Sequence, residues 1–475
     1  MMCGKPLLTF AAFEVTARRT MSTGIDQRRP VSQADFTADE LTRRRMRVME
    51  NMGAPGVALL QGEPAPAGFE AFRQSNEFYY LCGVEVPGAY LSIDAGTRQS
   101  TLYLLPRDDK QERSEGPMVC CQDAELLRRR TGVEEVRPVD SLPGDLKSLT
   151  LIYLPHSPCE GRMACRDTLR AMQKSIDADP MNARPSVEAH FLQRIRGVCP
   201  GAEIRDLSPI LDELRLVKSP AEVAVMRRAG HLSALAIIEA MRTTAPGMME
   251  YQLGAIADYV YMYHGVKGGS YRAIIAGGPN AWLTHYYRND CPLRDGDLVL
   301  MDYAPDVANY TSDIGRMWPV DGTYAPWQRE LYGFMVEYHK TILSRIRPGA
   351  TPEEVMAEAA QSMAQVLAKW TFSKPVYESA ARKTLEFKGH LSHPVGMAVH
   401  DVGSYFSRPL KPGTVFAVDP QMWVPEEKLY IRVEDTITVT ETGIENLTAA
   451  APLELDDVED MMRQESRFPL YHSAT

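Results

Sequence analysis

The sequence lacks any apolar run long enough to cross a membrane, and it lacks an excess of basic residues. Its 475 residues include 52 Lys and Arg against 62 Asp and Glu, which gives a formal net charge of −10 at pH 7. A membrane-spanning helix needs about 20 mostly apolar residues. Nucleic acids and anionic membranes bind clustered positive charge. We therefore expect neither a membrane nor a nucleic acid among the partners.

Cysteine patterns for disulfides or zinc are also missing. The eight cysteines include no Cys-x-x-Cys pair and suggest no disulfide framework. We therefore expect a reducing, cytoplasmic compartment. Residues 1–35 show no clear basic leader or cleavage site, so we interpret them as a disordered N-terminal extension, in which Met21 is an alternative start to Met1.

The length of the chain and its strand-like runs predict two domains. A chain of 475 residues is too long for one ordinary core. Residues 36–208 alternate short apolar runs with helical segments, which predicts an α/β domain. A second domain is expected at 209–455, and the polar residues 456–475 are expected to form a C-terminal tail. The predicted strands of the first domain lie at 57–62, 78–84, 89–95, 100–106 and 149–155.

The second domain contains an internal repeat. The segment LRDGDLVLMD (293–302) resembles LKPGTVFAVD (410–419), and each is a glycine turn followed by an apolar strand that ends in aspartate. A histidine precedes each copy, His285 in the first and His400 in the second. The repeat predicts two halves, related by duplication, that deliver histidines and carboxylates to one shared cleft.

Four carboxylates lie at the edges of apolar runs, at Asp302, Asp313, Asp419 and Glu434. One such acid is more often a turn residue, and a lone histidine such as His393 is more often structural. Four buried carboxylates that converge would repel one another and raise each other's pKa values, so they need counter-charges. Two divalent cations about 3.5–4 Å apart would supply them, and carboxylates with an imidazole suit Mn, Co, Zn or Mg.

Several segments together resemble the aminopeptidase P and prolidase group, metallopeptidases with the pita-bread fold. The resemblance covers about residues 36–455, and it implies an α/β (α+β) chain with a creatinase-like α/β domain at 36–208. A pseudo-two-fold pita-bread catalytic domain at 209–455 would follow. The segments are FRQSNEFYYLCGVEVPGAYLSID (72–94), MDYAPDVANYTSDIGR (301–316), HLSHPVGMAVHD (390–401), FAVDPQMW (416–423) and IRVEDTITVTETGIENLT (431–448).

The resemblance implies a ligand set for two divalent metal ions, with manganese expected first and cobalt or zinc as alternatives. Asp302 would bind one metal, Asp313 would bind both, and His393 would bind the second. Glu434 would be a further bridging carboxylate. Asp419 stands where the family has a glutamate that both binds metal and shuttles a proton.

Three further residues match catalytic positions of the family. His285 and His400 would flank the reacting carbonyl, and Arg432 would lie behind Glu434. The aromatic and basic residues near His285 are candidates for a specificity pocket, although packing and solvent contact explain them equally well. These residues are Trp282, Tyr286 and Arg288.

The chain departs from the family pattern at three places. Asp419 is one methylene, about 1.5 Å, shorter than the family's glutamate. The family has a histidine where this chain has Gly389, and here the imidazole follows at His390. Gly315 replaces the usual threonine, a change expected to be minor.

The resemblance implies metal-dependent hydrolysis of the peptide bond before proline, through a hydroxide that bridges two metals. The first expectation is an Xaa-Pro aminopeptidase whose partner is a peptide with proline at its second position. Alternatives are an Xaa-Pro dipeptidase, a metal-free C–N hydrolase of the creatinase type, and a catalytically silent binding protein, because Asp419 replaces glutamate. The family also implies a homodimer or homotetramer.

Overall fold

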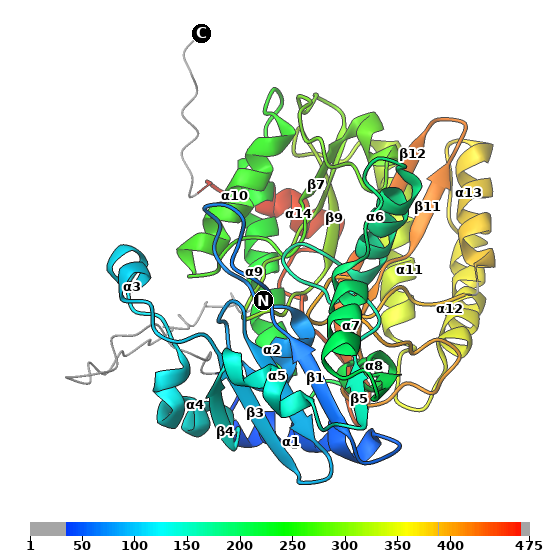
Figure 1. Cartoon of the computed structure of the whole chain (residues 1–475). Helices are drawn as coiled ribbons and strands as arrows, with labels where there is room; N and C mark the ends of the chain where they lie inside the picture. Colours follow the sequence, from blue (N-terminus) through cyan, green and yellow to red (C-terminus); the bar gives the residue numbers. More distant parts are fainter. Residues whose placement is uncertain (1–34, 388, 467–475) are drawn as a thin grey trace, which may run out of the picture.

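A computed structural model describes residues 35–387 and 389–466. The expectation of a disordered extension at 1–35 therefore falls almost wholly outside the described residues. Figure 1 shows an N-terminal part, coloured blue to teal, packed against the remainder of the chain, coloured green to red.

The N-terminal part is built on a mixed sheet with the strand order β4-β3-β2-β1-β5-β6. The strands β1 to β3 form an antiparallel meander, whereas β4, β5 and β6 join in parallel. Their bounds are β1 Val57–Gln61, β2 Tyr90–Asp94, β3 Gln99–Leu104, β4 Glu135–Pro138, β5 Leu151–Leu154 and β6 Glu203–Asp206. Three of the five predicted strand runs contain β1, β2 or β5, and a fourth, at 100–106, overlaps β3.

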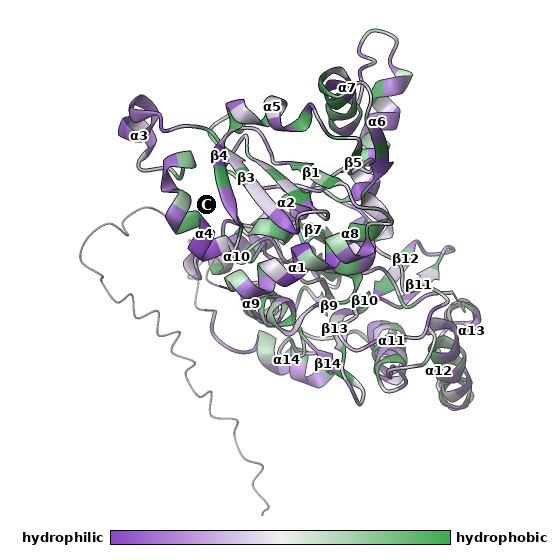
Figure 2. Cartoon of the chain, turned by 60° about the horizontal axis from the view of Figure 1, so that its bottom comes forward, coloured by the Kyte–Doolittle hydropathy of each residue, from purple (hydrophilic) through white to green (hydrophobic). Residues whose placement is uncertain are grey.

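Helices cover this sheet and connect its strands. They are α1 Ala38–Asn51, α2 Asn76–Cys82, α3 Asp109–Glu115, α4 Ala124–Thr131, α5 Leu142–Leu146, α6 Arg166–Ala178, α7 Val187–Val198 and α8 Ser208–Leu216, with short 3₁₀ turns at Cys121–Asp123 and Val139–Ser141. Figure 2 shows the projecting α3 as almost wholly hydrophilic, in agreement with its lack of buried residues.

The strand predicted at 78–84 is wrong, because this segment forms the helix α2. All seven residues of α2 are buried. A helix buried on every side has no polar face, so its short apolar run cannot be told from a buried strand. Gly83 ends the helix in the left-handed conformation, with φ 65°.

The second part is built on an antiparallel sheet with the order β10-β13-β9-β8-β7, to which β14 adds beside β13. Its strands are β7 Ile274–Gly277, β8 Leu298–Asp302, β9 Ile314–Pro319, β10 Val415–Val418, β13 Glu434–Val439 and β14 Ile444–Asn446; β11 Gln421–Val424 and β12 Leu429–Arg432 form a separate hairpin. The helices are α9 Pro220–Thr243, α10 Glu250–Tyr263, α11 Pro326–Leu343, α12 Pro352–Leu367, α13 Pro375–Glu386 and α14 Leu455–Met462, with a 3₁₀ turn at Gly278–Trp282.

The predicted internal repeat has matching local structure in both copies. Gly296 before β8 and Gly413 before β10 both have left-handed backbones, with φ of 78° and 86°. Asp302 is the last residue of β8, and Asp419 directly follows β10. The two repeats therefore place their aspartates at equivalent ends of two strands in one sheet.

The C-terminal tail expected from residue 456 does not begin there. Residues Leu455–Met462 form α14, in which Val458 is fully buried. Glu459 accepts the backbone N–H of Tyr324 at 2.9 Å. Short helices rich in acids have weak sequence signals, and tertiary packing decides whether they form. None of the helices within 35–387 and 389–466 combines the length and hydropathy that crossing a bilayer requires.

Candidate metal centre

The predicted carboxylates come together where the strands of the second sheet end. Asp302 ends β8, Asp313 directly precedes β9, Asp419 follows β10, and Glu434 opens β13. Strand β9 lies between β8 and β13, with Gly315 opposite both Asp302 and Glu434. All four carboxylate side chains are at most 5% exposed. The sequence was therefore right that these acids share one buried place.

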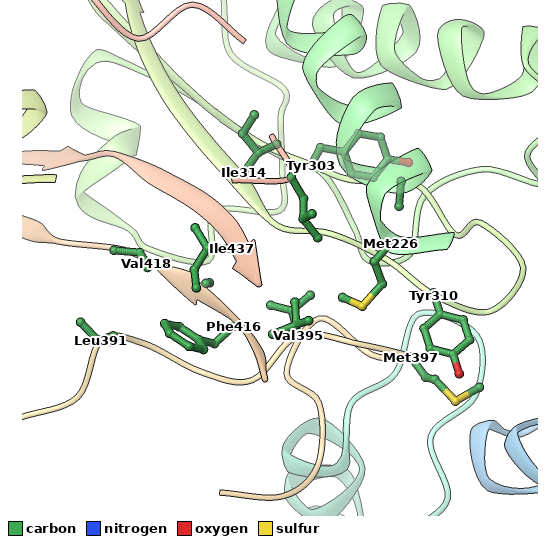
Figure 3. Packing of buried hydrophobic residues seen from close by; sticks show 14 of the residues in the cluster. Met226, Tyr303, Tyr310, Ile314, Leu391, Val395, Met397, Phe416, Val418 and Ile437 are labelled. Atoms are coloured by element: carbon green, nitrogen blue, oxygen red, sulfur yellow. The ribbon is translucent and has the colours of Figure 1, made fainter. Parts of the chain in front are cut away.

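Apolar neighbours fix the backbone that carries the polar side chains. Figure 3 shows Ile314, Leu391, Val395, Phe416 and Val418 in one packed cluster. Ile314 adjoins Asp313, Val418 adjoins Asp419, and Leu391 and Val395 lie on either side of His393 in the chain. None of these five apolar residues exposes more than 4% of its surface. The polar side chains therefore project from a rigid, close-packed base.

Arg432 joins three of the carboxylates. Its Nη1 lies 2.8 Å from Oδ2 of Asp302, and its Nε lies 2.8 Å from Oδ1 of Asp419. Its Nη2 donates to Oε2 of Glu434. The resemblance placed Arg432 behind Glu434 alone, whereas the structure gives it three carboxylate partners. A guanidinium presents several donors in one plane, and this geometry suits contact with several carboxylates.

Tyr271 is a site residue that sequence reasoning missed. Its hydroxyl lies 2.7 Å from Oδ1 of Asp302 and 2.8 Å from Oδ1 of Asp313. Tyr271 precedes β7, whose first residue Ile274 pairs with Asp302. A correct prediction that β7 pairs with β8 could have revealed Tyr271, because this pairing brings the segment before Ile274 to the end of β8.

His393 completes a smaller cluster with Asp313 and Glu434. One ligand atom from each of these three residues lies within 4.8 Å of the others. Nε2 of His393 is 3.4 Å from Oδ2 of Asp313, and Nδ1 contacts the carbonyl of Pro394 at 3.2 Å. Histidines that bind metal generally donate their other ring N–H in this way. Oε1 of Glu434 is buried and, among the described residues, has no hydrogen-bond partner.

Burial and like charge perturb the pKa values at this site. Burial, together with Asp313, raises the pKa of Asp302 to about 7, although Arg432 opposes the rise. Burial also raises the pKa values of Asp419 and Glu434. Burial alone would raise the pKa of Asp313, but His393 and Arg432 hold it below its usual range.

These side chains fit divalent cations. Three of the four buried carboxylates contact the guanidinium of Arg432, and one oxygen of Glu434 has no hydrogen-bond partner within residues 35–387 and 389–466. A buried, unpaired carboxylate oxygen is costly. Oxygen donors with one imidazole suit Mn, Co and Zn. Asp313, His393 and Glu434 offer ligand atoms within 4.8 Å of one another, and Arg432 links Asp302 and Asp419 to Glu434. The roles of all five residues as metal ligands stay predictions.

The two predicted substrate histidines lie in a row next to His393, with His400 nearer to it and His285 beyond. The ring centroid of His400 is 4.2 Å from that of His393 and 6.4 Å from that of His285. His400 also contacts Asp167 of α6, with Nδ1 2.8 Å from Oδ2. Their role in flanking a reacting carbonyl stays a prediction, and the structure adds a partner for His400 that the sequence did not indicate.

The candidate specificity residues near His285 are engaged elsewhere. Tyr286 is buried and donates its hydroxyl to Glu250 at 2.9 Å. Arg288 pairs with Asp290 on the surface. Trp282 packs edge-on against Trp423, with ring centroids 4.9 Å apart. Of the three, only Trp282 joins an aromatic pair close to β11.

Two of the departures from the family pattern have structural consequences. His390 stacks on Phe406, with ring centroids 4.7 Å apart, and meets Phe387 edge-on, so its ring is held between two phenylalanines. A Cβ atom on Gly315 would lie 3.1 Å from Cβ and 3.2 Å from Oε2 of Glu434. The glycine therefore leaves the space that Glu434 fills.

Known proteins resemble this chain in both of its parts. Residues 224–441 match metallopeptidase family M24, and residues 41–151 match the aminopeptidase P N-terminal domain. The chain is 33% identical over 454 residues to the Xaa-Pro aminopeptidase of Escherichia coli K12, covering 90% of this chain and 98% of that protein. It is 30% identical over 415 residues to human Xaa-Pro aminopeptidase 3, covering 83% and 78%.

Solved structures show the same likeness. Proline aminopeptidase P II from Yersinia pestis superposes with a TM-score of 0.73 at 32% identity, covering 90% of this chain and 99% of that one. Zinc-substituted E. coli aminopeptidase P in complex with product superposes with a TM-score of 0.73 at 30% identity, covering 90% and 98%.

Proposed function

Because the chain belongs to metallopeptidase family M24, we propose that it is an Xaa-Pro aminopeptidase, which releases the first residue of peptides with proline in second place. The observation that carries the proposal is the buried set of four carboxylates with His393. It occurs in a chain that matches Xaa-Pro aminopeptidases along 90% of its length.

We propose two divalent ions, manganese first and cobalt or zinc as alternatives. Asp302, Asp313, His393, Asp419 and Glu434 would hold them. When bound, such ions activate a water molecule and polarise the carbonyl that it attacks. Among the residues that the structure describes, none donates to Oε1 of Glu434, and this supports the assignment because a cation would satisfy that oxygen.

Asp419 carries the proton in this proposal. The leaving nitrogen belongs to proline, so it is a tertiary amide and must be protonated to depart. Asp419 takes a proton from the attacking water and delivers it to that nitrogen. Both of its oxygens are held, Oδ1 by Arg432 at 2.8 Å and Oδ2 by Gln421 at 2.6 Å. The carboxylate is therefore fixed in orientation, although its side chain is one methylene shorter than glutamate.

His285 and His400 bind the substrate on the open side of the site. His285 is exposed, and the His400 side chain is 34% exposed, so both imidazoles are accessible to a peptide. His285 would donate its N–H to the carbonyl oxygen as negative charge develops on it, and His400 would bind the substrate beside it. Arg432 pairs with the carboxylates of Asp302, Asp419 and Glu434 and restrains their positions.

The test is a peptide panel assayed with metal-stripped protein that is reloaded with Mn, Co or Zn. We expect Xaa-Pro-Yaa peptides to lose their first residue, and the matched Xaa-Ala-Yaa peptides to be cleaved far more slowly. Asp302→Asn and His393→Ala should abolish most of the turnover. As a matched control, Asp290→Asn removes a surface acid that pairs with Arg288 and should leave turnover unchanged.

The alternatives give different results in the same panel. Cleavage of Gly-Pro in preference to longer peptides would identify a dipeptidase. Stoichiometric metal without cleavage of any peptide would identify a silent binding protein. Turnover of peptides that persists without metal would contradict the proposed chemistry altogether.

We also propose a cytoplasmic location and a homodimer or homotetramer. All seven cysteines within the described ranges are free, which supports a reducing compartment. Sedimentation equilibrium would give the mass of the assembly, and a mass equal to one chain would contradict the second proposal.

A further inference from the structure

One hydrogen bond links the substrate histidine to the N-terminal part of the chain. Nδ1 of His400 lies 2.8 Å from Oδ2 of Asp167, although the two residues are 233 positions apart. Asp167 is the second residue of α6, which belongs to the N-terminal part. The contact therefore crosses between the two parts of the molecule at the edge of the proposed active site.

The backbone at His400 is held separately by its neighbour Asp401. This carboxylate is buried between Arg215, whose Nη2 lies 2.6 Å from Oδ1, and Lys218, whose Nζ lies 3.1 Å from Oδ2. A buried carboxylate with two cationic partners is strongly restrained. These ion pairs hold the main chain at His400, so its remaining motion is rotation of the imidazole. The hydrogen bond to Asp167 restricts that rotation.

The backbone at Asp167 is held by the same ionic network. Its neighbour Arg166 contacts Asp212 at 2.6 Å, Glu77 at 3.2 Å and Glu160 at 3.3 Å. Glu160 in turn contacts Arg215 at 2.9 Å. One chain of buried ion pairs therefore runs from Arg166 through Glu160 and Arg215 to Asp401. Because Arg166 adjoins Asp167 and Asp401 adjoins His400, this chain fixes the distance between the backbones of Asp167 and His400.

We infer that Asp167 is a positioning residue that orients His400 for the proposed peptidase reaction, on which this inference rests. An ionised carboxylate only accepts hydrogen bonds, so Nδ1 of His400 carries the proton that points to Asp167. This contact fixes both the orientation of the ring and its tautomer. It leaves Nε2 unprotonated, as an acceptor for a hydrogen bond from the substrate. Aspartates have this effect on histidines in other enzymes.

A purely structural role does not explain the contact. The side chain of Asp167 is 58% exposed and that of His400 is 34% exposed. Pairs with this exposure contribute about 0–1 kcal/mol to stability. The buried ion pairs around Arg215 already join the two parts of the molecule, so the bond from His400 to Asp167 adds little to the stability of the fold. Its main effect is to orient the imidazole of His400.

The test compares three variants in the full-length, metal-loaded protein. Asp167→Asn removes the charge, Asp167→Glu keeps a carboxylate, and Asp177→Asn is a matched control on the exposed side of the same helix. We expect Asp167→Asn to lower kcat by about 10–100-fold and to change KM less than threefold. Asp167→Glu should recover most of the lost kcat, and the control should behave like the wild type, with the same Tm in all four proteins.

A second measurement does not depend on peptidase activity. Nitrogen-15 NMR of the imidazoles reports the tautomer, and the signal of His400 is assigned by its loss in His400→Gln. We expect the Nδ1-protonated tautomer in the wild type and a mixture of tautomers in Asp167→Asn. If the protein cleaves no peptide, the proposed function fails, whereas this signal still tests the contact.

Two results would overturn the inference. One is an unchanged kcat in Asp167→Asn, and the other is an unchanged tautomer of His400 in that variant. A fall in Tm that accounts for the whole loss of activity in Asp167→Asn, without recovery in Asp167→Glu, would assign the residue to folding instead.

Discussion

Arg432 and Asp419 are joined by a 2.8 Å contact between Nε and Oδ1, and the strand partner of Arg432 secures the same carboxylate from its other side. That partner, Gln421, donates to Oδ2 of Asp419 at 2.6 Å. The end of the β11–β12 hairpin therefore orients the residue that stands in place of the family's glutamate. Donors on both oxygens therefore fix the orientation of this shorter side chain.

We predict that Asp419→Asn lowers kcat by about 10²–10⁴-fold, the usual contribution of a general acid–base group. The amide has nearly the same size, so Arg432 and Gln421 lose a charged acceptor while the packing is kept. Steady-state kinetics on an Xaa-Pro-Yaa peptide measures the effect, with metal content measured in parallel. A variant that keeps full activity with full metal would remove Asp419 from the proton path.

We predict that Arg432→Ala lowers the free energy of unfolding of the metal-free protein by about 3–5 kcal/mol. The change removes the shared cation from three buried carboxylates, and breaking a buried ion pair on one side has this magnitude. Urea unfolding in a chelator measures it. Arg382→Ala breaks an exposed pair with Glu378 and should change stability by less than about 1 kcal/mol. An equal effect in both variants would show that the three contacts contribute nothing specific.

We predict that the metal-free protein loses stability as the pH rises from about 4 to 7. Asp302 has an ordinary pKa of 3.8 and a folded pKa of about 7. Between these values the folded state binds the proton that the unfolded state has released, so stability falls with rising pH. Urea unfolding across this range should show a smaller slope in Asp302→Asn.

Added metal should reverse this loss, because the ligands bind as carboxylates. Saturating Mn²⁺ should therefore raise the free energy of unfolding more at pH 8 than at pH 5. The opposite order would mean that these carboxylates are not its ligands.

We predict opposite effects for two helical glycines. A Cβ at Gly230 in α9 would lie 2.3 Å from the carbonyl oxygen of Leu447, whereas a Cβ at Gly197 in α7 would have nothing within 4 Å. Gly230→Ala should destabilise the protein by about 1–3 kcal/mol. Gly197→Ala should stabilise it by about 0.5–1 kcal/mol, because alanine favours the helix. Thermal unfolding of both variants checks this, and equal shifts would contradict the close approach of α9 to Leu447.

Local patterns in the sequence predicted much of the fold. The apolar runs at 57–62 and 149–155 contain β1 and β5, which are buried almost continuously, as short unbroken apolar runs predict. The repeated glycine turns and strand-end aspartates drew attention to Asp302 and Asp419, which both contact Arg432. The family and the α/β fold class were confirmed.

The errors came from segments whose structure depends on surrounding elements. The run at 78–84 looked like a strand, but burial on all sides made it α2. Residues 456–462 looked like part of a tail, but Val458 packs in the core. In both segments the conformation depends on packing against other elements of the fold, and a local sequence pattern does not show which elements these are.

The sequence by itself determined that apolar strands end next to acids such as Asp302 and Asp419, because apolar runs and turn glycines define a strand over a few neighbouring positions. The tertiary structure alone decided that Tyr271 reaches Asp302, that Arg432 joins three carboxylates, and that Asp167 meets His400. These contacts join residues that are as many as 233 positions apart. Their geometry is fixed only when the sheets and helices pack, since hydrogen bonds need partners placed to within a few tenths of an ångström.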